Sequence, residues 1–83
     1  MSSFAPEGWC IESLRKAKGI SLEEISNDTK LKLSTLRAIE KGKFGELPGG
    51  VYNISYIRQF ARAIGADETV LVQLYRTTHP SAA

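Results

Sequence analysis

The sequence predicts an all-α fold, a compact domain of five short helices. Apolar residues recur at intervals of three and four along most of the chain, which is the period of an amphipathic helix. Gly19, Gly42 and Gly65 follow these stretches, where glycine commonly ends a helix in the left-handed conformation. No strand-like alternation occurs, and 83 residues are enough for one hydrophobic core and one domain.

The first helix is expected from residue 8 or 9 to residue 18, because its apolar residues lie about one turn apart: Ile11, Leu14 and Ala17. Cys10, the only cysteine, falls in this pattern and is expected to be a small buried side chain. A single cysteine allows neither an intrachain disulfide nor a thiolate zinc site. We therefore expect a reducing, cytoplasmic location.

The segment from residue 21 to residue 42 predicts two helices joined by a tight turn. Ser21 and Glu24 have the spacing of a capping box, so the second helix is expected from Leu22 to about Thr29. The third is expected to begin near residue 33 and to end at Gly42. Four apolar residues fall where the two helices face each other and the core: Ile25, Leu31, Leu36 and Ile39. Such a unit presents its second helix on a convex edge that fits a DNA major groove.

A loop rich in glycine and proline, residues 42–50, precedes a fourth helix expected over residues 51–64. Four residues form its predicted buried stripe: Ile54, Ile57, Ala61 and Ile64. Asp67 predicts the start of a fifth helix, whose inward-facing residues are expected to be Val70, Leu71 and Leu74. The predicted organisation is a flexible leader over residues 1–7, the helix-turn-helix domain over 8–76, and a tail over 77–83 that contains the lone histidine, His79.

Three segments carry a family resemblance: IESLRKAKGISLEEIS at 11–26, TLRAIEKGKFGELPGGVY at 35–52 and YIRQFARAIGADE at 56–68. They resemble the Cro and lambda-repressor type of helix-turn-helix domain, and within it the N-terminal domain of the RodZ family of bacterial cell-shape proteins and its standalone relatives. ELPGGVY followed by YIRQFARAIG is the distinctive part. The resemblance implies a five-helix lambda-repressor-like fold and a cytoplasmic location. It also implies two kinds of partner, an actin-like filament protein of the MreB type or DNA.

The first candidate site is the basic surface around the third helix. Between residues 30 and 43 the only acidic residue is Glu40. The same stretch contains five basic residues: Lys30, Lys32, Arg37, Lys41 and Lys43. Because Leu36 and Ile39 point inward, the groove-facing residues are expected to be Lys32, Leu33, Ser34, Arg37, Ala38 and Lys41. Arg37 could donate two hydrogen bonds to guanine and Ser34 could bond a base edge, while the lysines suit phosphates. A solvated face of mixed charge is the alternative.

The second candidate site lies on the predicted fourth helix. Tyr52 and Tyr56 are one turn apart and lie off the apolar stripe, and Arg58 could flank them. The resemblance matches them to the aromatic pair through which RodZ domains contact their filament, although Ile54 and Ser55 replace an arginine and a glycine usual there. Alternatively, one tyrosine packs against the fifth helix and keeps its hydroxyl in solvent.

Composition and motifs exclude several functional classes. With 42% hydrophobic and 24% charged residues, the chain has the composition of a globular protein. It has no glycine-rich phosphate loop, metal-ligand cluster or nucleophile–base pair, so we expect no enzyme, cofactor or small-molecule substrate. No signal peptide or membrane helix is expected in this chain. The prediction is a DNA-binding module that regulates transcription, with a non-catalytic adaptor for an actin-like filament as the alternative. The sequence leaves the oligomeric state open.

Overall fold

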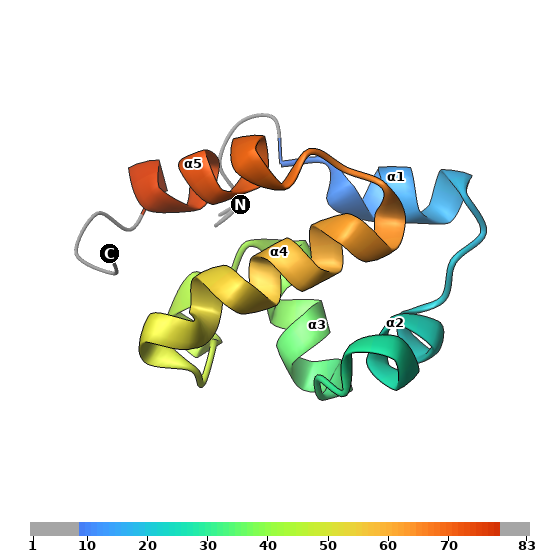
Figure 1. The fold of residues 1–83 in the computed structure, drawn as a ribbon, viewed down its shortest axis with the longest axis horizontal. Coiled ribbons are helices and arrows are strands. Elements are labelled where there is room, and N and C mark those ends of the chain that lie inside the picture. Colours follow the sequence, from blue (N-terminus) through green and yellow to red (C-terminus); the bar gives the residue numbers. More distant parts are fainter. Residues whose placement is uncertain (1–8, 79–83) are drawn as a thin grey trace.

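The computed structural model describes residues 9–78 and confirms the predicted all-α fold. Within these residues lie five α-helices and two short 3₁₀ helices (Figure 1): α1 (Ile11–Ala17), α2 (Leu22–Thr29), α3 (Leu33–Lys41), η1 (Phe44–Glu46), η2 (Gly50–Tyr52), α4 (Asn53–Ile64) and α5 (Glu68–Thr78). In Figure 1, α4 crosses the middle of the domain, with α5 on one side and α2 and α3 on the other. Helix α4 packs on α1, α2 and α5.

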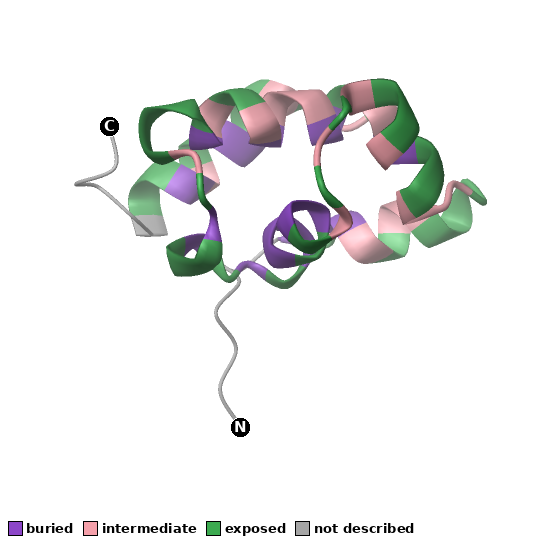
Figure 2. Cartoon of the chain, turned by 90° about the horizontal axis from the view of Figure 1, so that it is seen from below, coloured by how far each residue is buried: buried purple, intermediate pink, exposed green. Residues whose placement is uncertain are grey.

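The core forms where α4 meets its neighbours. Ile57, Phe60, Ala61 and Ile64 recur every three or four residues on α4, and all are fully buried. Figure 2 shows that the buried positions of the surrounding helices also face this interior. An aromatic row closes the core, because Phe44 lies edge-to-face with both Trp9 and Tyr75, at centroid distances of 5.1 and 4.9 Å. The Trp9 indole N–H also donates to the Ile39 carbonyl at 2.8 Å.

A buried ion pair joins α1 to α3. The Arg15 guanidinium donates from Nε to Glu40 Oε2 at 2.5 Å and from Nη2 to Oε1 at 3.3 Å. Its third nitrogen donates to the Ile20 carbonyl at 2.9 Å, so the same side chain also fixes the loop between α1 and α2. Hydrogen bonding to the Glu40 carboxylate raises the pKa of Arg15.

The helix-turn-helix unit is closed by local hydrogen bonds. The predicted capping box is present: Ser21 Oγ accepts from the Glu24 N–H at 3.0 Å, and Glu24 Oε1 accepts from the Ser21 N–H at 2.9 Å. Ser26 donates its hydroxyl to the Leu31 carbonyl at 2.6 Å, which ties the last turn of α2 to the turn before α3. The Gly42 residue that ends α3 has φ of 72°, as its predicted role requires.

Two buried-residue predictions for the C-terminal half were wrong. Helix α4 begins at Asn53 and not at Val51, because residues 50–52 form a 3₁₀ turn in which the Tyr52 N–H donates to the Gly49 carbonyl at 2.8 Å. Ile54, in the first turn of α4, is only half-buried, at the edge of the core. Val70, predicted to face inward, is 48% exposed, because α5 packs through a stripe one residue further along the chain that includes Val72.

The predictions for the two ends of the domain also need correction. Cys10 is exposed, not buried, because α1 begins one residue later and Trp9 and Ile11 fill the core on either side of it. Ala17 is exposed at the end of the same short helix. At the other end, α5 continues to Thr78, two residues beyond the predicted domain boundary. The predicted leader, residues 1–7, and His79 in the predicted tail lie outside the described residues.

The ion pair gives a stability prediction. Replacing Glu40 with Ala leaves the Arg15 charge buried without its partner, so the free energy of unfolding should fall by about 3–5 kcal/mol. The double variant Arg15→Met with Glu40→Leu replaces both charges by apolar groups and should recover most of that loss. Urea denaturation of the wild type and the variants measures both values. A Glu40→Ala protein as stable as the wild type would contradict the assignment.

Candidate nucleic-acid interface

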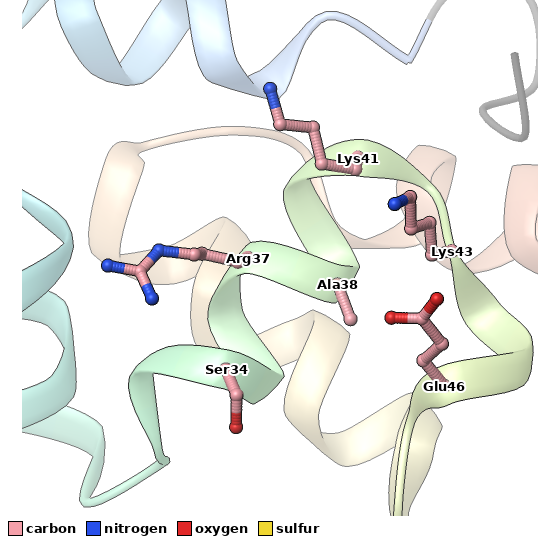
Figure 3. A pocket seen from close by; sticks show the side chains of 6 residues that line it. All are labelled: Ser34, Arg37, Ala38, Lys41, Lys43 and Glu46. Carbon is pink, nitrogen blue, oxygen red and sulfur yellow. The ribbon is translucent and has the colours of Figure 1, made fainter.

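One face of α3 points away from the core. Leu36 and Ile39 are fully buried, and Ser34, Arg37 and Lys41 therefore lie on the exposed side of the helix (Figure 3). Leu33 is half-buried. Ala38 corrects a prediction, because the sequence placed it among the groove-facing residues and it is only 5% exposed.

A hollow of about 340 Å³ lies along this face (Figure 3). It is lined by Ser34, Arg37, Ala38, Lys41, Lys43 and Glu46. Ser34 and Ala38 supply small side chains, and the three basic residues supply positive charge. Glu46 brings a carboxylate into the hollow from η1, and sequence reasoning missed it. Its position in the ELPGG segment, shortly after a basic run, was the available signal.

A second hollow, of about 230 Å³, lies near the start of α3. It is lined by Lys30, Leu31, Lys32, Thr35, Pro48 and Tyr56. Thr35 lies about 100° around the helix from Ser34, since each residue of an α-helix turns by that angle. The two hollows therefore occupy neighbouring faces of α3. Together they include every cation of the predicted basic surface.

The cations of this surface differ in their partners. Among residues 9–78, Lys30, Lys32, Arg37 and Lys43 form no ion pair. Lys41 is the exception, because its ammonium lies 3.4 Å from Glu12 Oε1 on α1. The same carboxylate pairs with Lys16 at 3.1 Å, and the hydrogen bond from Lys16, followed by the charges of both lysines, holds the pKa of Glu12 below its usual value.

The residues of the second predicted site, on and before α4, do not form one surface in the structure. Tyr52 is 65% exposed on η2, beside Val51, which is 76% exposed and which sequence reasoning did not select. Tyr56 is half-buried and borders the second hollow, next to the basic surface. Arg58 is turned to α5, where its Nη1 lies 3.2 Å from Glu68 Oε1. The three residues predicted as one partner site therefore face different neighbours.

Glu68 holds two arginines of α4. Its carboxylate lies 2.8 Å from Arg62 Nε in addition to its contact with Arg58. Hydrogen bonds from Arg62 and then from Arg58 hold the pKa of Glu68 below its usual value. The pairs connect the end of α4 with the start of α5, so these arginines serve the fold.

Comparison with known proteins identifies the family of this chain. The profile of a helix-turn-helix domain family matches residues 11–71. The chain belongs to that family. The cytoskeleton protein RodZ of Streptococcus pneumoniae is 33% identical over 67 residues, which cover 77% of this chain and 24% of RodZ. An uncharacterized membrane protein of Bacillus subtilis, YmfM, is 31% identical over 62 residues, which cover 75% of this chain and 22% of YmfM.

These matches confirm the resemblance that the sequence motifs predicted. The chain spans about a quarter of the length of the curated relatives it matches. No solved structure is significantly similar to it. Within residues 9–78, every helix is too short or too polar to cross a bilayer.

The position of Lys41 gives a prediction about polyanion binding. Glu12→Gln removes the carboxylate that holds Lys41 and adds one net positive charge beside α3. Affinity for duplex DNA should therefore rise about 2- to 10-fold at low salt and converge with the wild type at high salt, since salt screens exposed charges. Fluorescence anisotropy titration measures this change. The matched control is Glu23→Gln on α2, an exposed carboxylate that forms no ion pair with any of residues 9–78. Unchanged affinity in Glu12→Gln would show that Lys41 takes no part in binding.

Proposed function

We propose that this helix-turn-helix module binds double-stranded DNA and regulates transcription, with the exposed face of α3 in the major groove. The observation that carries this proposal is the group of four cations around α3 that lack an ion-pair partner within residues 9–78: Lys30, Lys32, Arg37 and Lys43. By contrast, the arginines of α1 and α4 are used in ion pairs within the domain. Unpaired surface cations gain most from a polyanion, because binding releases the counterions of the DNA.

The residues of this surface have different proposed roles. Arg37 and Ser34 lie on the exposed face and can hydrogen-bond base edges, and the half-buried Leu33 suits a thymine methyl group. Lys30, Lys32 and Lys43 suit phosphates, which fix the position of the protein without reading sequence. Ala38 is buried and reads no base; its small side chain leaves room for a partner in the first hollow. The proposed module is non-catalytic, works without a cofactor and is located in the cytoplasm.

Glu46 limits which groups can occupy the first hollow. A carboxylate repels a phosphate, and it can accept a hydrogen bond from the amino group of cytosine. Glu46 lies in the same hollow as Lys43 and Arg37. We therefore assign the first hollow to base edges and the phosphate contacts to its rim. A single module covers about 600–1,000 Å² of protein surface on DNA, so tight sequence-specific binding requires two modules on one site.

The proposed function predicts the salt dependence of binding. With three or four phosphate contacts, log K should fall against log salt with a slope of about −3 to −4, since each contact contributes roughly −0.9. Lys32→Gln and Lys43→Gln should each reduce the slope by about 1 on every duplex, whereas Arg37→Ala should flatten any sequence preference. The matched control is Arg76→Gln on α5, which removes one exposed cation elsewhere. A folded protein that binds no duplex at low salt would contradict the proposal.

A protein-binding adaptor is the second candidate function. Val51 and Tyr52 are adjacent, large and exposed at the start of α4, which is the kind of apolar surface that marks a protein contact. The similarity to the cytoskeleton protein RodZ supports the same idea. The partner expected from the family resemblance is an actin-like filament. This surface uses different side chains from the exposed face of α3.

The adaptor function has its own test. Replacing Val51 and Tyr52 with Ser should weaken binding to an actin-like bacterial filament at least about 10-fold, as the loss of an aromatic anchor commonly does. Co-sedimentation measures this change, and a duplex titration of the same variant should match the wild type. Val70→Ser, which alters an exposed apolar residue on α5, is the control. Tyr56 is left unchanged because it packs within the domain. Unaltered co-sedimentation would remove this surface as the filament site.

A further inference from the structure

We infer that the second hollow, at the start of α3, is a phosphate-binding pocket formed by Thr35, Tyr56, Lys30 and Lys32. The inference rests on the proposed DNA-binding function for the origin of the phosphate, which is the DNA backbone. It assigns to this pocket two residues, Thr35 and Tyr56, that otherwise have no role in DNA binding. Four independent features of the hollow support it.

The first feature is a buried hydroxyl group without a partner. Thr35 borders the hollow and is only 5% exposed. Its hydroxyl forms no hydrogen bond with any residue that the structure describes. A buried hydroxyl group that lacks a hydrogen bond costs stability, and buried polar groups are nearly always satisfied by protein, water or a ligand. The Thr35 hydroxyl is therefore available to a ligand in the hollow.

The second feature is the start of α3, which has no side-chain cap. Lys32 occupies the N-cap position, and its side chain makes no capping hydrogen bond. The N–H groups of Leu33, Ser34 and Thr35 have no acceptor among residues 9–78, and the first N–H of α3 with one is that of Leu36, bonded to the Lys32 carbonyl. Helical N–H groups point toward the N-terminal end, where they and the helix dipole favour an anion.

The third feature is the charge of the lining. Lys30 and Lys32 flank the start of the helix, and the residues that line this hollow within the described chain include no carboxylate. Lys30 has φ of 64°, a left-handed conformation that glycine or asparagine adopts at lower cost. With lysine at this position the hollow gains an ammonium group, and the domain is less stable than it would be with glycine. The first hollow, by contrast, contains Glu46 and is not suited to a phosphate.

The fourth feature is the loop that holds Tyr56 in place. Its ring lies directly over Gly49, so that a Cβ atom at Gly49 would clash with the ring carbons and lie 2.9 Å from the hydroxyl oxygen. The Asn53 side chain accepts a hydrogen bond from the Gly49 N–H at 3.0 Å and holds this loop in place. The loop therefore fixes the tyrosine at the border of the hollow, where its hydroxyl can donate to an anion.

The pocket is tested first without DNA. Inorganic phosphate is titrated into the folded protein, and the amide signals of Leu33, Ser34 and Thr35 are followed by NMR, with sodium chloride at equal ionic strength as the reference. We expect saturable shifts with phosphate only. Thr35→Val and Tyr56→Phe keep the shapes of the side chains and should each weaken phosphate binding about 5- to 10-fold. Arg76→Gln, which removes an exposed cation on α5 that lines neither hollow, should leave it unchanged.

The variant Lys30→Gly separates an effect on phosphate binding from an effect on stability. It should raise the melting temperature, because glycine adopts the left-handed conformation freely, and it should weaken phosphate binding. Shifts that the chloride titration reproduces, or equal phosphate affinity in Thr35→Val and the wild type, would overturn the pocket.

A duplex titration then connects the pocket to DNA. Thr35→Val should lower duplex affinity by the same factor on all sequences, because a phosphate contact carries no sequence information. If phosphate binds as expected but the wild type binds no duplex, the DNA-binding function is wrong and the pocket stands. If the wild type binds duplexes and Thr35→Val binds them equally well, the backbone phosphate lies elsewhere and the inference is overturned.

Discussion

The buried ion pair between Arg15 and Glu40 determines which face of α3 is available to a partner. Glu40 lies next to Ile39, whose carbonyl accepts the indole N–H of Trp9, so two consecutive residues of α3 are fixed against the N-terminal part of the domain. The opposite face then necessarily points to solvent. A buried pair of this kind is costly to assemble, since both charges leave water. Its geometry, with two hydrogen bonds to the carboxylate and a third to Ile20, offsets that cost and orients the helix.

The charges of the domain fall into two groups as a consequence. Those of Arg15, Arg58 and Arg62 are neutralised by carboxylates on neighbouring elements and hold helices together. Those of Lys30, Lys32, Arg37 and Lys43 surround the exposed side of α3 without ion-pair partners in the described chain. A net charge of +2 would not indicate this separation. The arrangement of the charges, and not their sum, supports a polyanionic partner.

Tyr56 connects the two candidate surfaces. It belongs to α4, which the family resemblance associates with a protein partner, but its ring lies over Gly49 and borders the hollow beside Lys30 and Lys32. Pro48, next to Gly49 in the same loop, also borders this hollow.

The sequence by itself determined the five helices and those of their ends that carry a local signal, because these depend on residues close together in the chain. The capping box of α2 needs only Ser21 and Glu24, three residues apart, and the end of α3 needs only Gly42. The helical period also indicated that Leu36 and Ile39 face inward and Arg37 outward.

Only the tertiary structure decided how closely other elements pack against each face of a helix. Helical periodicity indicates the direction in which a side chain points, and it does not indicate the distance to the next element. The tertiary structure buried Ala38, paired Lys41 with Glu12 on α1, 29 residues earlier in the chain, and brought Tyr56 to the start of α3. These are contacts between elements that are distant in the chain, and they decide which of the predicted site residues a partner can reach.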